Sequence, residues 1–206
     1  MNTHALEQPR FTAYIRLLVT LVDDRQPGYQ RHAHAVTRLC QMVGMRLGVD
    51  DAVLEHLRLA ALLHDAGLLR MPFPHLGSRW DLPMEERRVW ETHPEQGARM
   101  MRMLGLPDEA ATAVLGHHER WDGSGYPAGL KGDQVSLAAR ILGVCDAFDG
   151  ALSGCRGAGD CSLGQGEALE VLRSEESARF DQRLVRVLCE ALEDEREISV
   201  LTGVSA

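Results

Sequence analysis

Histidines and aspartates recur in this sequence at positions where a purely structural role would be costly. His32 is in phase with the apolar stripe of Val36, Leu39 and Val43, and Asp146 lies inside the apolar segment 137–148. A buried carboxylate destabilises a fold by several kcal/mol unless it is paired or bound to a metal. The histidines and aspartates for which we expect such a ligand role are His32, His64, Asp65, His93, His117, His118 and Asp146.

These side chains offer nitrogen and oxygen donors and no thiolate, a set that suits iron, manganese or zinc. Seven donors exceed the needs of one ion, so we expect two neighbouring ions that share a carboxylate. Asp65, directly after His64, is the expected bridge. Such an ion pair activates a water and holds the oxygens of a phosphoester, so the predicted chemistry is phosphoester hydrolysis, with Asp65 orienting the water.

The prediction depends on the set and not on any single member. A lone histidine near a helix end is more often a core or capping group than a ligand. His34, for example, falls on the opposite face of its helix from His32 and is expected to be solvated.

The hydrophobic pattern that must position these residues is helical. Apolar residues recur at three- and four-residue spacing, and no stretch alternates for long enough to predict a strand. We therefore expect an all-α fold, a helical bundle with a metal site in its core. The predicted helices cover 11–22, 30–47, 51–66, 83–93, 94–104, 108–118, 136–152, 167–174 and 182–193.

Several residues mark how these helices begin, end and pair. Gly48 is expected to end the second helix, and Asp50 or Asp51 to cap the third. Asp181 is expected to cap the last. Arg140, inside an apolar helix, is expected to pair with a buried carboxylate.

Composition excludes several classes of protein. The chain has 206 residues, 45% hydrophobic and 25% charged, which fits one globular domain, and its net charge of −8 argues against a partner that is a nucleic-acid polymer. The five cysteines show no C-x-x-C spacing, which excludes a zinc ribbon and is typical of a reducing compartment. No apolar run is long enough to span a membrane and no signal peptide is evident, so a cytoplasmic location is expected.

Two motifs are specific enough to indicate a family. They are Leu62-Leu63-His64-Asp65 and His117-His118-Glu119-Arg120-Trp121-Asp122-Gly123-Ser124-Gly125-Tyr126-Pro127. With Thr92-His93-Pro94 and Cys145-Asp146-Ala147-Phe148-Asp149, they resemble the HD-GYP family of HD-domain phosphohydrolases. The resemblance covers 28–192, with 1–27 as an N-terminal helix packing on that domain and 193–206 as a C-terminal tail. It implies an all-helical, metal-dependent phosphodiesterase of cyclic di-GMP, with iron or manganese held by the seven residues already identified.

The sequence departs from the family pattern where metal and phosphate are bound. Gly28 replaces a glutamate that helps hold a third ion in some members, which favours two ions here. Leu68 stands in place of a phosphate-binding lysine, so Leu68→Lys is expected to strengthen substrate binding. Cys155 and Ala158 fall where a basic segment is usual. The residues considered as substitute substrate contacts are Arg120, Tyr126, Lys131 and Arg156.

Three functions remain open from the sequence. The first is hydrolysis of cyclic di-GMP in bacterial second-messenger signalling, and the second is hydrolysis of another nucleotide or phosphoester. The third is a catalytically weak module that binds a ligand or a protein. The expected partners are a cyclic dinucleotide, other signalling proteins, and a second copy of the chain. The signalling proteins would dock on the loop around Gly125-Tyr126-Pro127, the Gly-Tyr-Pro loop.

Overall fold

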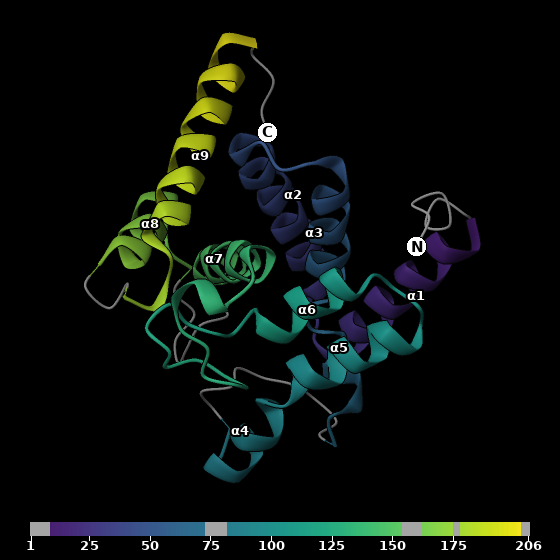
Figure 1. Ribbon diagram of the computed structural model, residues 1–206. Coiled ribbons are helices and arrows are strands. Elements are labelled where there is room, and N and C mark those ends of the chain that lie inside the picture. Colours follow the sequence, from purple (N-terminus) through teal and green to yellow (C-terminus); the bar gives the residue numbers. More distant parts are fainter. Residues whose placement is uncertain (1–8, 73–81, 154–161, 175–177, 203–206) are drawn as a thin grey trace.

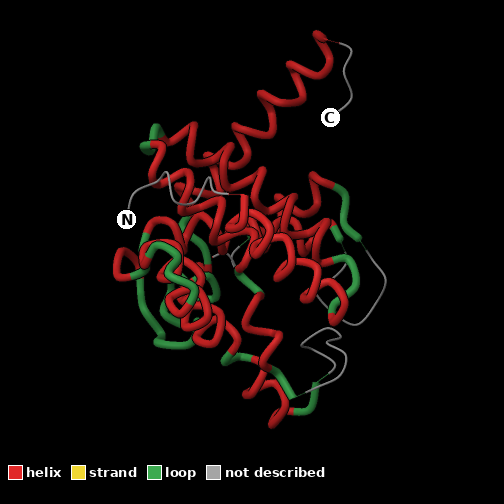
Figure 2. Tube along the Cα trace, turned by 90° about the vertical axis from the view of Figure 1, so that its right-hand side faces the viewer, coloured by secondary structure: helices red, strands yellow, loops and turns green. Residues whose placement is uncertain are grey.

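The computed structural model describes residues 9–72, 82–153, 162–174 and 178–202, and these ranges contain helices and loops but no strand (Figures 1 and 2). The all-α prediction is therefore confirmed. The α-helices are α1 (Pro9–Arg25), α2 (Tyr29–Leu47), α3 (Asp51–Leu63), α4 (Met84–Trp90), α5 (His93–Met103), α6 (Asp108–Gly116), α7 (Leu137–Leu152), α8 (Gln165–Arg173) and α9 (Gln182–Thr202). Two short 3₁₀ helices, η2 (Ala66–Arg70) and η4 (Gly132–Gln134), lie in the connections.

Local chemistry explains several of the helix ends. Asp50 caps α3, because its side chain accepts a hydrogen bond from the Val53 amide at 2.8 Å. Gly48 ends α2 in the left-handed region at φ 68°, which glycine adopts without strain. The Ser136 side chain accepts from the Ala139 amide at the start of α7. These ends agree with the turn residues of the sequence.

Several predicted helix ends are wrong. The first helix continues to Arg25 instead of ending at Val22, and the fourth ends at Trp90 instead of His93. The third helix ends at Leu63 and not at Ala66, because the chain turns at His64 and Asp65 before it enters η2. The last helix continues past residue 193 to Thr202. The break expected at Pro94 is present, and α5 begins at His93 with this proline in its first turn.

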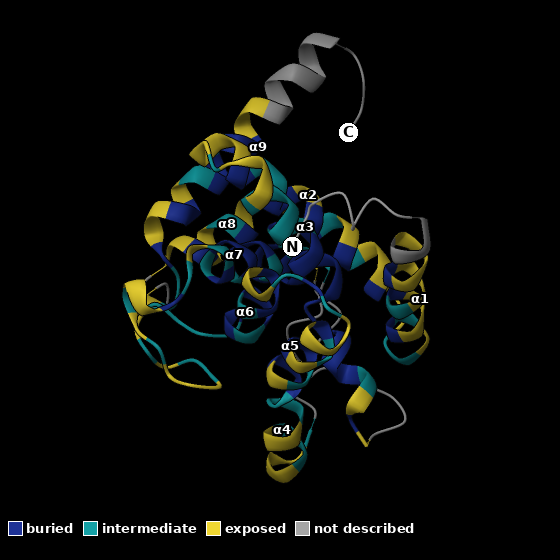
Figure 3. Cartoon of the chain, turned by 45° about the vertical axis from the view of Figure 1, so that its right-hand side comes forward, coloured by how far each residue is buried: buried dark blue, intermediate teal, exposed yellow. Residues whose placement is uncertain are grey.

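Helix α7 is the centre of the bundle. It packs against α2, α3, α6, α8 and α9, and nine of its sixteen residues are buried. Figure 3 shows dark blue concentrated on α7, α3 and α6 at the centre of the bundle, while α4, α8 and α9 carry much yellow and teal. Helix α1 covers the bundle with the buried side chains of Ile15, Val19 and Val22. The helices that carry histidines thus surround one apolar core.

Two glycines let η2 lie directly on the backbone of α5. A Cβ atom at Gly67 would lie 2.0 Å from the carbonyl oxygen of His93 and 2.7 Å from the Gly97 nitrogen. A Cβ at Gly97 would in turn lie 3.3 Å from the Gly67 nitrogen. This close approach brings the turn that carries His64 and Asp65 against the first residue of α5.

Among the described residues, no helix has the length and the apolar composition needed to cross a membrane.

Candidate metal centre

The predicted ligands converge in the core from distant parts of the chain. The donor atoms form two groups. Within each group all the atoms lie within 4.8 Å of one another, and Asp65 belongs to both groups. The first group is completed by His93, His117 and His118, and the second by His32 and His64. Asp146 joins the second group, with its Oδ1 atom 3.2 Å from His32 Nε2 and 3.8 Å from His64 Nε2. The shared carboxylate is the one that the sequence predicted as the bridge.

Three of the histidines are oriented by the backbone of their own helical turn. The Nδ1 atoms of His64, His93 and His117 lie 2.8, 2.8 and 2.6 Å from the carbonyl oxygens three residues earlier. A carbonyl only accepts, so each Nδ1 carries the proton and donates it. The Nε2 atom of each ring is then left with a lone pair that faces the cluster, which is the form a metal binds.

His32 is oriented by a carboxylate and not by a carbonyl. Its Nδ1 donates to Asp149 Oδ2 at 2.6 Å, and its Nε2 faces Asp146 and His64. Asp149 was quoted in the family motif but not predicted as a site residue. The sequence signal for Asp149 is its position three residues after Asp146, because residues three apart on a helix lie on the same face.

The electrostatics of the chain shift the pKa values of the candidate ligands in two directions. Burial, with the neighbouring His64 and His93, lowers the pKa of His117 to about 4, and the pKa of His118 also falls well below its usual value. Burial alone would raise the pKa of Asp65 and Asp146, but the surrounding histidines outweigh it and hold both well below the usual range.

The pKa values of His32 and His64 shift the other way. Burial would lower the pKa of His32, but its contacts with Asp146 and Asp149 raise it to about 10, and Asp65 raises the pKa of His64 against the same burial effect. The chain thus presents neutral imidazoles at His117 and His118, charged carboxylates, and a protonated His32 whose proton a metal would displace.

His118 provides a direct test of whether a metal fits. Its Nε2 atom is buried and has no hydrogen-bond partner among the described residues, although an unpaired buried polar atom is costly. His93 Nε2 and His117 Nε2 also lie only 3.5 Å apart. A divalent cation would satisfy these donors together, and its nitrogen and oxygen ligands would be of the right type.

The Gly-Tyr-Pro loop is attached to the end of α6 beside this cluster. The Glu119 carboxylate accepts hydrogen bonds from the amides of Ala128 and Leu130 at 2.7 and 3.0 Å. A Cβ at Gly125 would lie 2.5 Å from the His118 carbonyl oxygen, so only glycine permits this approach. The loop places the Tyr126 ring 4.9 Å from the His118 ring.

The residues predicted to contact substrate differ in their burial and in the residues that they contact. Tyr126 is half-buried against a metal-facing histidine, whereas Lys131 is exposed and its side chain packs over Gly123. Arg120 is half-buried and its charge helps lower the pKa of Asp122. Arg156 lies outside the described residues, as do Cys155 and Ala158.

Leu68 changes the expectation attached to it. Its side chain is fully buried and packs with Met71 and Trp90. A lysine at position 68 would have to bury its ammonium group or displace Met71 and Trp90. Leucine at this position is therefore part of the packing and not only the absence of an exposed cation.

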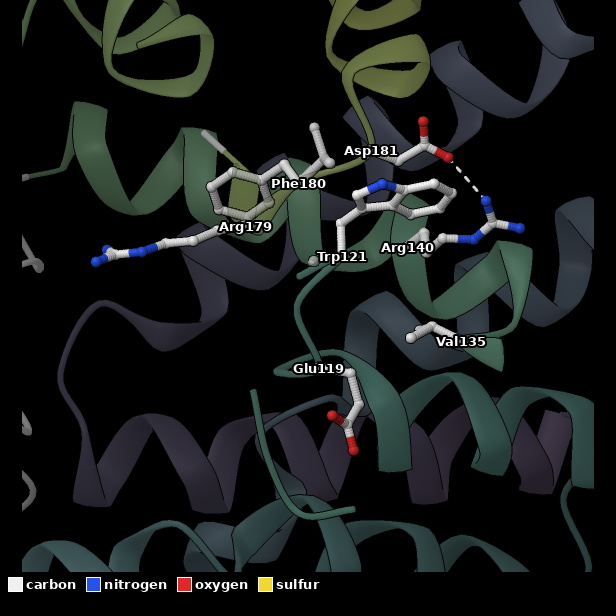
Figure 4. Close-up of a pocket in the computed structure, with 9 residues that line it drawn as sticks. Glu119, Trp121, Val135, Arg140, Arg179, Phe180 and Asp181 are labelled. Carbon is white, nitrogen blue, oxygen red and sulfur yellow. Dashed lines mark hydrogen bonds and ion pairs between the residues drawn. The ribbon is translucent and has the colours of Figure 1, made fainter. Parts of the chain in front are cut away.

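A separate polar cluster joins the Gly-Tyr-Pro loop to α7 and α9. Arg140 donates to Asp181 at 2.7 Å, which confirms the expected pairing, and Figure 4 shows this contact beside Trp121. The guanidinium groups of Arg140 and Arg183 each lie over the Trp121 ring, 5.3 and 5.1 Å from its centroid. Asp181 also accepts from the Arg183 amide at 3.0 Å, as expected of a cap on α9. The pocket in Figure 4 is thus lined by residues that fix the loop.

The chain matches a family model over most of its length. The family model for the HD domain matches residues 16–184. The chain belongs to the HD-domain family. The family predicted from His64-Asp65 and Gly125-Tyr126-Pro127 is confirmed, and the buried His64-Asp65 pair of this HD domain is the turn between α3 and η2.

Curated relatives share the domain but are longer. A cyclic di-GMP phosphodiesterase of Pseudomonas aeruginosa is 35% identical over 167 residues, 78% of this chain and 38% of the relative. The 3′3′-cGAMP-specific phosphodiesterase 3 of Vibrio cholerae is 34% identical over 145 residues, 68% of this chain and 32% of the relative. The chain thus spans about a third of the length of these two relatives.

Solved structures support the fold. An HD-GYP protein from Bdellovibrio bacteriovorus superposes with a TM-score of 0.67 at 21% identity, covering 87% of this chain and 60% of that one. At this identity the likeness shows the helical architecture alone.

Proposed function

We propose that this HD domain is a metal-dependent phosphodiesterase that hydrolyses cyclic dinucleotides, with cyclic di-GMP as the foremost substrate. The observation that carries the proposal is Asp65, a carboxylate shared by two groups of histidine donors whose orientations are already fixed. The relatives named as phosphodiesterases of cyclic di-GMP and 3′3′-cGAMP support the substrate class.

The residues divide into two sets around Asp65. His93, His117 and His118 would hold one ion, and His32, His64 and Asp146 a second, with iron or manganese as the proposed metal. When bound, such a pair supplies Lewis acidity that activates water and neutralises charge on the phosphoryl oxygens. Asp65 also orients the attacking water, and Tyr126 offers its ring to a base beside His118.

The test is hydrolysis by purified protein loaded with iron or manganese. We expect two ions per chain and cleavage of cyclic di-GMP or 3′3′-cGAMP in a panel of cyclic dinucleotides. Asp65→Asn, which keeps the size of the side chain, should lose metal and lower the rate more than about a hundred-fold. Glu170→Gln, an exposed change on α8, is the matched control.

One observation favours a second candidate, a domain that binds its ligand without efficient hydrolysis. The buried Leu68 leaves no lysine beside the His64-Asp65 turn. A metal-loaded protein that binds cyclic di-GMP in calorimetry but cleaves no member of the panel would establish that alternative. Absence of both binding and cleavage would contradict both functions.

A further inference from the structure

The candidate ligands of the metal centre differ in how far their side chains are exposed. The side chains of His64, His93 and His117 are 1% exposed or less, whereas those of His32 and Asp146 are 15% and 21% exposed. His118 is also half-buried. The Asp65 side chain is 12% exposed, so we expect a substrate to approach over Asp65, His32, Asp146 and His118.

Trp90 lies beside two of the candidate ligands. Its ring centroid is 4.4 Å from that of His93 and 5.8 Å from that of His118, and the side chain is half-buried. Tyr126 contacts the same His118 from the Gly-Tyr-Pro loop, with 4.9 Å between ring centroids. Two partly exposed aromatic rings, from segments far apart in the sequence, thus border one metal-facing histidine.

The surface behind Trp90 is apolar. Leu68 and Met71 pack against it, and their exposed fractions are 0% and 5%. The position where the family pattern predicts a phosphate-binding cation is therefore filled by the support of an aromatic ring. Such a ring attracts the face of a nucleobase, which every purine offers, and has little affinity for a phosphate.

We propose that Trp90 stacks on a purine base of the substrate, next to the ligands of the metal centre, and so determines the substrate class. The inference rests on the proposed function, since it assigns the base to the cyclic dinucleotide hydrolysed there. Stacking then adds to the substrate affinity that the phosphate contacts of the metal centre provide.

The test compares two probes that differ by a base. Binding of GMP and of ribose 5-phosphate to the metal-loaded protein is measured by calorimetry, so the result does not depend on hydrolysis. Trp90→Leu should weaken GMP binding about ten-fold or more and leave ribose 5-phosphate binding unchanged, because only GMP has a base to stack. The same variant should raise KM for cyclic di-GMP with little change in kcat.

The controls separate stacking from support of the metal centre. Trp90→Phe keeps an aromatic ring and should retain GMP binding within about three-fold, and Val89→Ala, an exposed change on α4, should bind both probes normally. The hydrogen bond from His93 Nδ1 goes to the backbone carbonyl of residue 90, which every variant keeps. Metal content should therefore stay constant.

Two outcomes would overturn the proposal. One is equal weakening of GMP and ribose 5-phosphate, or loss of metal, in Trp90→Leu, since the ring would then only support His93. The other is unchanged binding of both probes. If Trp90→Leu does not fold, GMP should quench tryptophan fluorescence in the natural protein and much less in Trp90→Phe, and equal quenching in both would reject stacking. GMP stacking without cleavage of any cyclic dinucleotide would reject the proposed function alone.

Discussion

Asp149 shows how a side chain outside the ligand set controls the metal centre. His64, His93 and His117 each donate to a backbone carbonyl of their own turn, and these contacts survive any side-chain change. His32 is different, because its orientation relies on the Asp149 carboxylate at 2.6 Å. The position of His32 is therefore the one that a single substitution can release.

Asp149→Ala should lower metal affinity about 10- to 100-fold, the usual effect of removing a carboxylate behind a ligating histidine. Asp149→Asn keeps an acceptor oxygen and should lie between the natural protein and Asp149→Ala. Competition with a chromophoric chelator measures the affinity, with the distant Glu170→Gln as a control. Equal metal affinity in all four proteins would show that packing alone orients His32.

Leu68→Lys should destabilise the protein and not restore a missing function. The leucine is fully buried under Trp90, and burying an ammonium without a partner is unfavourable. We expect a loss of about 2–4 kcal/mol in the free energy of unfolding, measured in urea, against less than about 1.5 kcal/mol for Leu68→Met. Unchanged stability together with tighter binding of cyclic di-GMP would contradict this expectation.

The residue types identified the ligands better than their supports. His32, His64 and Asp146 could be identified because they are polar groups on apolar helical faces. Asp149 and Trp90 did not, because a second carboxylate on α7 and a tryptophan near a helix end are both ordinary in a soluble domain. Their roles depend on which ring lies across from them, and that information exists only in three dimensions.

At the scale of elements, the contact between η2 and α5 sets the distance between the two ligand groups. Asp65 Oδ1 lies 3.1 Å from His93 Nε2 only because Gly67 touches the first turn of α5. The helical pattern predicted α5 but not η2, which begins at the predicted end of the third helix. It did not predict their spacing, since periodicity reports which face is buried and not how closely two backbones approach.

Gly67→Ala should impair both stability and metal binding. The added Cβ would lie 2.0 Å from the His93 carbonyl oxygen, so η2 must move away from α5. We expect a loss of at least about 2 kcal/mol of stability and at least about ten-fold weaker metal binding. Gly166→Ala on α8, where a Cβ would meet nothing within 4 Å, should be neutral or stabilising by up to about 1 kcal/mol. Similar behaviour of the two variants would reject the role of this backbone contact.

The Arg140–Asp181–Arg183 cluster should make stability depend on acid pH. Burial raises the pKa of Asp181, but its hydrogen bonds with Arg183 and Arg140 outweigh this and leave the pKa below its ordinary value. The ionised carboxylate therefore stabilises the fold above about pH 4, the pKa of an unfolded aspartate, and this contribution disappears as pH falls through the lower folded pKa. The stability difference between the natural protein and Asp181→Asn should be largest near pH 7 and shrink in acid. A difference that does not change with pH would contradict it.

At the scale of the whole molecule, the metal centre joins α2, α5, the end of α6, α7 and the turn after α3. Bound metal should therefore stabilise the complete bundle and not one local segment. Removing it with a chelator should lower the melting temperature by about 10 °C, equivalent to about 4 kcal/mol, as measured by circular dichroism. Asp65→Asn should melt at nearly the same temperature with and without chelator. An unchanged melting temperature for the natural protein would mean that the core holds its shape without metal.

The wide separation of the ligands in the sequence also determines when the centre can form. His32 and Asp146 lie 3.2 Å apart in the folded protein but 114 positions apart in the chain. During synthesis, the histidines of α2, α5 and α6 leave the ribosome before α7, so the early part of the chain has imidazoles but lacks the carboxylates of α7. The complete set of donors exists only after α7 has been made and has docked. The first group, formed by Asp65, His93, His117 and His118, needs nothing from α7, whereas a chain truncated before α7 lacks Asp146 and Asp149 beside His32. Completion of the second group is thus the late event in biogenesis.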